Sequence, residues 1–205
     1  MGWYRDRVLP RIQDREMGAA RLRTARERVC ATLEGDVLEI GFGTGLNTPY
    51  YPRTVSKVVA VEPSTVCMRI AEPRVAASTA PVEYGGLTGE HLDLPTGEFD
   101  AVLSTWRLCT IPDVDAALSE VRRVLRPGGS FHFIEHGHAP DSKVARWQER
   151  LEPINKRVGG GCHLTRRIAE HIERAGFKIE KLDTYYFPGE LRPLGYTFEG
   201  RAISD

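Results

Sequence analysis

The chain has 205 residues and a mass of 22.9 kDa, which suits one sizeable core and is short for two independent enzyme domains. Lysine plus arginine equals aspartate plus glutamate at 28 each, so no net charge draws the chain to nucleic acid or an anionic membrane, and a small-molecule partner is favoured. The four cysteines, Cys30, Cys67, Cys109 and Cys162, include no C-x-x-C pair, which argues against a disulfide framework or zinc knuckle and favours a reducing compartment.

The N-terminal segment, residues 1–33, is rich in arginine and amphipathic, and it carries neither a signal-peptide pattern nor an apolar run of the roughly 20 residues that a membrane span requires. We therefore expect a cytoplasmic protein without an integral membrane segment, either free or peripheral to a membrane. The arginines are interleaved with acidic residues, which indicates a solvated helix face more than a phospholipid or acidic-acceptor contact. They are Arg5, Arg7, Arg11, Arg15, Arg21, Arg23, Arg26 and Arg28.

Short β-rich runs then alternate with helical patterns. The expected strands are residues 37–40, 57–62, 80–86 (the weakest of the set), 99–105 and 130–135. Between the last two, apolar residues from Val114 to Leu125 follow helical spacing, and Pro127 and Gly128 end that helix. Because these strands are apolar nearly throughout, the pattern predicts a doubly wound α/β protein whose parallel sheet is covered on both faces.

After Glu135 the pattern changes. We expect two helices at about residues 142–157 and 166–175, followed by two β-rich stretches at 177–187 and 194–202. The turn residues between these stretches indicate a hairpin, so the last strand is expected to run antiparallel near the sheet edge.

The stretch "VLEIGFGTGLN", residues 37–47, is typical of a buried strand that breaks into a glycine loop and then opens a helix. A dinucleotide-binding loop has the pattern G-x-G-x-x-G, in which the third glycine lets the helix pack closely on the strand. Here the glycines are Gly41, Gly43 and Gly45, and Leu46 stands where the third glycine of that pattern belongs. The loop therefore does not match the dinucleotide pattern.

Two acidic residues refine this interpretation. Glu39 precedes the loop, where a carboxylate repels a pyrophosphate and attracts an ammonium group. Glu62 ends the second strand, where it is placed to accept hydrogen bonds from a ribose diol. The pair favours a nucleoside cofactor with a positive amino group and no phosphate.

The order of "VLEIGFGTG", "VVAVEPS", "GEHLDLPTGEFDAVLST" and "VRRVLRPGGSFHFIEH" over residues 36–136 resembles the class I S-adenosylmethionine-dependent methyltransferases. The resemblance implies a Rossmann-like, seven-stranded sheet of order 3-2-1-4-5-7-6 with strand 7 antiparallel. It implies S-adenosyl-L-methionine as cofactor and S-adenosyl-L-homocysteine as product.

The resemblance also implies roles for individual residues. Glu39 and the glycine loop would hold the methionine moiety, Glu62 the ribose, and Gly89 and Glu90 would border the adenine. The complete set of implied cofactor residues is Glu39, Gly41, Gly43, Gly45, Asn47, Glu62, Pro63, Gly89, Glu90, Ser104 and Thr105.

Further motifs resemble a narrower group, the methyltransferase-like thiol S-methyltransferases and their bacterial relatives. These motifs are "STWRLCTIPD", "FIEHG", Trp147 with Gln148, and "GCHLTR". Eukaryotic members of the group begin with a membrane-anchoring apolar segment, and residues 1–33 here are arginine-rich instead. The resemblance implies one domain over residues 1–205, with a helical lid at 1–33 that carries Trp3 and Tyr4, a cofactor core at 34–136, and helices with a C-terminal hairpin at 137–205.

Ligands of open α/β sheets bind outside the carboxyl ends of the strands, which places Trp106, Arg107 and Glu135 near the acceptor. His136 is our candidate for a proton acceptor or positioning group. His163 either faces the acceptor or only terminates its loop. For His132, His136 and His138, buried or loop positions are favoured over metal ligation, and Cys162 is taken as a packing residue, so no metal site is expected.

Three functions of different classes follow. The first is methyl transfer to a small, rather apolar acceptor, a thiol by resemblance, with O- or C-methylation of a phenol or quinol as the alternative. The second is a nicotinamide-dependent oxidoreductase, which Leu46 and Glu39 argue against, and the third is a non-catalytic cofactor-binding module. Nucleic acid is disfavoured by the neutral charge and by "STWR", residues 104–107, where base N-methyltransferases carry a proline-rich tetrapeptide. The state of assembly is left open between monomer and homodimer.

Overall fold

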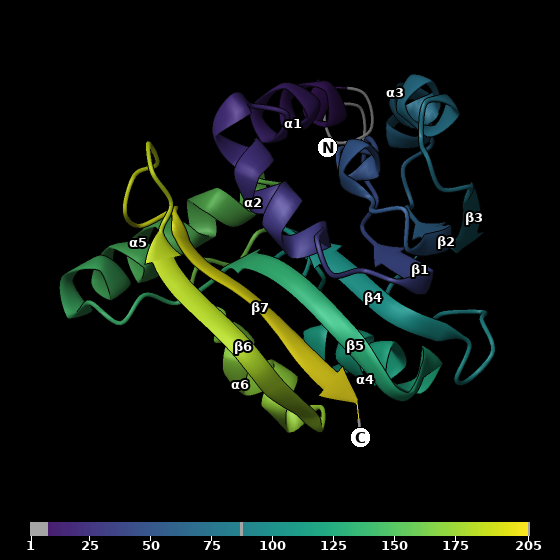
Figure 1. The fold of residues 1–205 in the computed structure, drawn as a ribbon. Helices are drawn as coiled ribbons and strands as arrows, with labels where there is room; N and C mark the ends of the chain where they lie inside the picture. The colour runs from purple at the N-terminus through teal and green to yellow at the C-terminus, as the bar shows by residue number, and fades with distance from the viewer. Residues whose placement is uncertain (1–7, 87, 205) are drawn as a thin grey trace.

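The computed structural model describes residues 8–86 and 88–204 and contains a seven-stranded sheet of order β3-β2-β1-β4-β5-β7-β6 (Figure 1). The strands are β1 (Gly35–Ile40), β2 (Val55–Val61), β3 (Val82–Gly86), β4 (Phe99–Thr105), β5 (Leu125–His136), β6 (Phe177–Tyr186) and β7 (Tyr196–Ser204). The first five strands pair in parallel, and β7 runs antiparallel between β5 and β6. The expected fold class, strand order and hairpin are confirmed.

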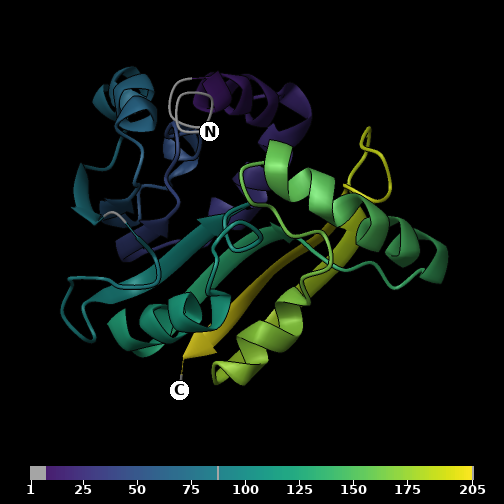
Figure 2. The same cartoon turned by 180° about the vertical axis from the view of Figure 1, so that it is seen from behind.

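Helices cover both faces of this sheet (Figures 1 and 2). They are α1 (Leu9–Met17), α2 (Ala20–Cys30), α3 (Thr65–Ala76), α4 (Val114–Val124), α5 (Ser142–Val158) and α6 (Ile168–Arg174). In Figure 2 the helices α4 and α6 lie in front of the sheet, and α2 lies behind it. The N-terminal helices and α5 lie toward the end of the sheet where the parallel strands finish.

Side-chain alternation along the strands explains the two layers. On β1, Leu38 and Ile40 belong to the core beneath α4 and α6, whereas Val37 belongs to the core beneath α2. Successive side chains of a strand point to opposite faces, so a strand that is apolar at every position supplies both cores. This is why the central strands are nearly continuous apolar runs.

The sequence did not predict the helix after the glycine loop correctly. An α-helix was expected there, and the structure has only a single turn of 3-10 helix, η2 (Thr48–Tyr50). Tyr51 ends that turn in an extended conformation, φ −64° and ψ 123°. Pro52 follows it, and a proline disfavours the helical conformation of the residue before it. The chain therefore leaves the loop extended.

The start of β5 also differs from the expectation. We expected a strand from residue 130, and β5 begins at Leu125 and includes residues 126–129. Gly128 has φ +76°, and the pairing register shifts between Phe99 and Ala101 on β4. A glycine with positive φ accommodates such an irregularity without ending the strand.

Candidate functional site

The glycine loop between β1 and η2 needs its glycines for conformational and steric reasons. Gly41, Gly43 and Gly45 have φ values of +73°, +58° and +73°, which other L-residues rarely adopt. A Cβ atom on Gly41 would also lie 2.2 Å from Cγ of Arg107, in the loop after β4. Arg107 therefore lies directly against the glycine loop.

Glu39 is buried at the head of β1, with 1% of its surface exposed. Its carboxylate accepts a hydrogen bond from Nδ2 of Asn47 at 2.8 Å and another from the Tyr51 hydroxyl. Burial raises the pKa of Glu39 to about 7, although the hydrogen bonds from Tyr51 and Asn47 and the nearby Arg26 charge oppose that rise. Burial thus favours the neutral form of this carboxyl, and Tyr51, Asn47 and Arg26 favour its charged form.

Arg26 of α2 faces the same place from the N-terminal helices, with 5% of its surface exposed. Its guanidinium donates to Oδ1 of Asn47 at 2.6 Å and to Oγ1 of Thr105 at 3.4 Å, and lies 4.8 Å from the ring centroid of Trp106. Burial lowers the pKa of Arg26, and the Glu39 carboxylate opposes that fall. The solvated-face interpretation is therefore wrong for Arg26.

The burial of Arg26 could have been predicted from the helical spacing of the apolar residues on α2. Leu22, Val29 and Cys30 are buried on α2 and lie four residues before, three after and four after Arg26. Residues at these separations share one face of a helix, so Arg26 lies on the apolar face of α2. Tyr51, which donates its hydroxyl to Glu39, has no comparable pattern around it in the sequence.

Glu62, directly after β2, closes the other side of the glycine loop. Its carboxylate accepts hydrogen bonds from the backbone N–H groups of Gly43 and Ser64, each at 2.8 Å, and Pro63 lies between Glu62 and Ser64 in the chain. The side chain of Ser64 in turn accepts from N of Cys67 and caps α3. Glu62 and the glycine loop, distant in sequence, are thus joined by a hydrogen bond.

Gly89 and Glu90 lie toward α4. A Cβ atom on Gly89 would lie 2.9 Å from Cγ2 of Ile40 and 4.0 Å from Cβ of Ala117. Oε1 of Glu90 accepts from the backbone N–H of Asp113, the N-cap of α4, at 3.4 Å. These two residues therefore border the end of β1 from the side of the sheet opposite α2.

Glu135 and the loop after β4 form a second buried polar group. The Glu135 carboxylate accepts from Oγ of Ser104 at 2.8 Å, from N of Arg107 at 3.0 Å and from N of Cys109 at 3.3 Å. Burial raises its pKa, while the backbone N–H donors oppose that rise. Trp106 has φ 52°, a strained conformation for a bulky side chain, in the same loop. Glu135 therefore holds this loop in shape.

His136 ends β5 beside two cysteines from distant parts of the sequence. The possible ligand atoms of Cys109, His136 and Cys162 all lie within 4.8 Å of one another. Nε2 of His136 is 3.7 Å from Oε2 of Glu190, and its ring centroid is 6.4 Å from that of Trp106. No sequence motif links His136 with Cys162, so their proximity was not predicted.

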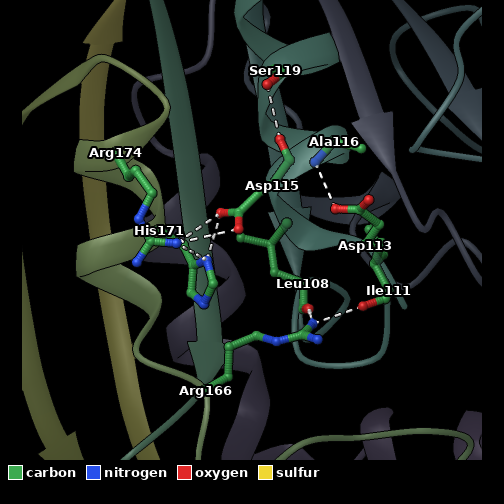
Figure 3. A network of polar contacts seen from close by, with 9 residues as sticks. All are labelled: Leu108, Ile111, Asp113, Asp115, Ala116, Ser119, Arg166, His171 and Arg174. Carbon is green, nitrogen blue, oxygen red and sulfur yellow. Dashed lines mark hydrogen bonds and ion pairs between the residues drawn. The ribbon is translucent and has the colours of Figure 1, made fainter.

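His163 and Arg166 connect the α5–α6 loop with the loop after β4. His163 donates its backbone N–H to O of Cys109 at 2.8 Å, and its Nδ1 lies 3.2 Å from Oε1 of Glu152. The Arg166 guanidinium donates to the carbonyl of Leu108 and, at 2.8 Å, to that of Ile111 (Figure 3). Arg166 was not among the site residues expected from the sequence.

Two cavities lie apart from the glycine loop. One of about 680 Å³ lies between α4 and α6, next to the ion pairs of Asp115 with His171 and Arg174 (Figure 3), and His163 and Arg166 line it. The other, of about 450 Å³, lies between α2 and the hairpin of β6 and β7. The residues expected to hold the cofactor line neither of these two cavities.

Trp3 and Tyr4, the expected lid residues, lie outside the described residues. No helix within residues 8–86 and 88–204 is both long enough and apolar enough to cross a membrane.

Comparisons with known proteins give consistent results. A family described as a methyltransferase domain matches residues 38–133. The chain is 35% identical to thiol S-methyltransferase TMT1B of Rattus norvegicus over 175 residues, which cover 83% of this chain and 71% of the relative. It is 31% identical to the demethylmenaquinone methyltransferase of Thermobifida fusca over 131 residues, covering 62% of this chain and 50% of the relative.

A solved structure is similar over the full length. It is a SAM-dependent methyltransferase of Thermotoga maritima, described as a possible histamine N-methyltransferase, with a TM-score of 0.72 and 23% identity, covering 99% of this chain and 100% of that one. A likeness at this identity supports the fold and says nothing about the acceptor.

Proposed function

Because this chain belongs to the class I S-adenosylmethionine-dependent methyltransferases, we propose that it methylates a small, rather apolar acceptor, with a thiol as the first candidate. The bound cofactor supplies a methyl group on a sulfonium, which is already an activated electrophile. The protein has to bind the cofactor, align the acceptor with it and exclude water.

A pair of buried opposite charges at the head of β1 is the observation that carries the cofactor proposal. Glu39 and Arg26 are both buried and both contact Asn47, Glu39 from the strand and Arg26 from α2. The amino-acid end of the cofactor is a zwitterion, so Glu39 would bind its ammonium group and Arg26 its carboxylate. The diphosphate of a dinucleotide would instead be repelled by the Glu39 carboxylate. The loop also lacks the third glycine of the dinucleotide pattern, because Leu46 stands there.

The rest of the cofactor would follow the carboxyl ends of β1 and β2. Glu62 would exchange one of its backbone hydrogen bonds, to Gly43 or Ser64, for the ribose diol. Gly89 and Glu90 would border the adenine. Arg107, which lies against Gly41, would border this path.

The acceptor would lie beyond Thr105 and Trp106. Trp106 packs its ring against Phe187 and His136, with centroids 6.4 Å apart in each pair, and these rings supply an apolar wall. The helices α1 and α2 would act as the lid of this space. A thiol suits the site because it ionises near neutral pH and needs little help from a base. The thiol S-methyltransferase relatives support this choice.

Two measurements test the proposal. Calorimetry should show saturable binding of S-adenosylhomocysteine and none of NAD, and the reverse result would remove the cofactor assignment. A methyl-transfer assay over thiols, phenols, quinols and amines, with products identified by mass, should give a methyl thioether. Methylation of a quinol carbon or a phenol oxygen alone would replace the thiol by the alternative acceptor, and cofactor binding without transfer to any of them would indicate a non-catalytic module.

A further inference from the structure

A Cys2His cluster, which we define as Cys109, His136 and Cys162, lies where three separate segments meet. Cys109 is in the loop after β4, His136 is the last residue of β5, and Cys162 is in the loop between α5 and α6. Their possible ligand atoms lie within 4.8 Å of one another, and Cys109 is buried while His136 and Cys162 are half-buried. Three soft or borderline donors therefore converge on one point inside the protein.

Hydrogen bonds fix the backbone of each cysteine. Cys109 donates its N–H to Oε2 of Glu135 at 3.3 Å and accepts at its carbonyl from N of His163 at 2.8 Å. The carbonyl of Cys162 accepts from Nδ2 of Asn155 at 2.9 Å. The two cysteine loops are thus joined to each other and to β5, so the convergence does not depend on exposed, mobile side chains.

The loop that carries Cys162 is shaped for this placement. Gly160 and Gly161 precede it with φ values of +69° and +100°, conformations that L-residues with side chains rarely adopt. On the other side, Arg166 donates to the carbonyls of Leu108 and Ile111, which flank Cys109 (Figure 3). Glycine turns and a buried arginine therefore hold the Cys162 loop against the Cys109 loop.

We propose that the Cys2His cluster binds a zinc ion. Zn–S bonds of about 2.3 Å and Zn–N bonds of about 2.0 Å place tetrahedral ligands roughly 3.5 to 3.8 Å apart, within reach of rotamer adjustments from the observed cluster. Two thiolates and an imidazole select zinc over magnesium or calcium, which require oxygen ligands. Two thiolates also balance the charge of a divalent ion in a buried place.

Glu190 completes the surroundings of the cluster. Its Oε2 lies 3.7 Å from Nε2 of His136. In metal sites a carboxylate near one ring nitrogen of a histidine orients the ring and fixes its tautomer, leaving the other nitrogen for the metal. His136 would in this case be a ligand, and the role of proton acceptor that the sequence suggested for it would not apply.

Three protein ligands leave the fourth position of a tetrahedral zinc ion open, as in catalytic zinc sites. Trp106 lies between the cluster and the cofactor residues, with its ring 6.4 Å from that of His136 and 4.8 Å from the Arg26 guanidinium. This step rests on the proposed function. The acceptor thiol would lose its proton to solvent, and its sulfur would bind as a thiolate at the open position of the zinc ion.

The test measures metal on the untagged full chain, without any need for turnover. The chain is purified under reducing conditions, dialysed against metal-free buffer, and its zinc is counted by mass spectrometry. We expect about one zinc per chain, and in the cobalt(II)-substituted protein a sulfur-to-cobalt charge-transfer band with the intense visible bands of a tetrahedral site. Cys109→Ser and Cys162→Ser should each lose most of the metal and the band.

Cys67→Ser is the matched control, because Cys67 lies on α3 and away from the cluster, and it should keep the full metal content. Binding of S-adenosylhomocysteine shows whether each variant is folded. A chain without zinc after reconstitution, a Cys109–Cys162 disulfide in the freshly reduced and dialysed protein, or retained metal in both cluster variants would overturn the proposal. Zinc binding without methyl transfer would support the cluster and refute the proposed function. Thiol methylation by a chain stripped of its zinc would support the proposed function and refute a role of the zinc ion in holding the acceptor thiolate.

Discussion

Replacing Glu39 by glutamine should change how the stability of the protein depends on pH. Glutamine keeps the shape of the side chain and an oxygen that can accept from Asn47, and it removes the charge. Burial raises the pKa of the wild-type carboxyl from 4.5 to about 7. Between these two pH values the folded protein therefore holds a proton that the unfolded chain has released. Its stabilising contribution is complete below pH 4.5 and is lost as the pH rises through 7.

The size of the effect follows from the two pKa values. Integrating the linkage relation between pH 5 and pH 8 for a group with pKa 4.5 unfolded and about 7 folded gives a loss of about 2.5 kcal/mol. The Gln variant lacks this loss. The free energy of unfolding of the wild type relative to the variant should therefore fall by about 2.5 kcal/mol over that range, whatever the absolute difference at one pH.

Urea denaturation of both proteins at several values between pH 5 and pH 8 measures this difference. Glu27→Gln makes the same chemical change at an exposed position of α2 and serves as the control. The reasoning is refuted if Glu39→Gln and the wild type show the same pH dependence to within about 0.5 kcal/mol, which is the usual additivity error. The Gln variant should also bind S-adenosylhomocysteine more weakly, because the ammonium group loses its charged partner.

Three further changes test other parts of the site. Arg26→Met should weaken S-adenosylhomocysteine binding at least about tenfold through loss of a charge-assisted hydrogen bond, measured by calorimetry, whereas Arg23→Met on the exposed face should not; equal effects would contradict the proposed carboxylate contact. Gly41→Ala should destabilise the chain by at least about 1 to 2 kcal/mol in urea denaturation because of its positive φ, and the overlap of the new Cβ with Arg107 adds to this cost; an unchanged midpoint would mean that the loop relaxes freely. Arg166→Met leaves two main-chain carbonyls without their donor and should lower the free energy of unfolding by about 1 to 3 kcal/mol. The exposed Arg167→Met should change it by no more than about 0.5 kcal/mol. Thermal unfolding compares the two variants, and similar midpoints would refute the bridging role.

Much of the fold was predictable because the signals are local. The central strands are short, apolar at successive positions and separated by helical patterns, and this alone specifies a parallel sheet with two covered faces. The order of the motifs over residues 36–136 then supplied the strand order through resemblance. Boundaries were missed where backbone detail decides, as at η2, where Pro52 keeps the chain extended, and at β5, where Gly128 lets the strand start early.

The contacts of the candidate site were less predictable because they join residues far apart in the chain. Cys109 and Cys162 have no sequence motif in common, and only the folding of two loops onto the end of β5 brings them together. The burial of Arg26 was hidden for a different reason: arginine is mostly exposed, so composition favoured solvent although helical spacing pointed inward. The roles of individual residues toward cofactor and acceptor stay predictions.

The helix α2 is tied to the protein at two places through arginines two positions apart. While Arg26 points to Asn47, Arg28 donates to both carboxylate oxygens of Glu199 on β7, at 2.8 and 2.7 Å. Anyone who grafts the N-terminal helices of a relative onto this chain to alter its acceptor has to carry over both partnerships. A graft that keeps only one of the two arginines would leave either Glu199 or Asn47 without its cationic partner.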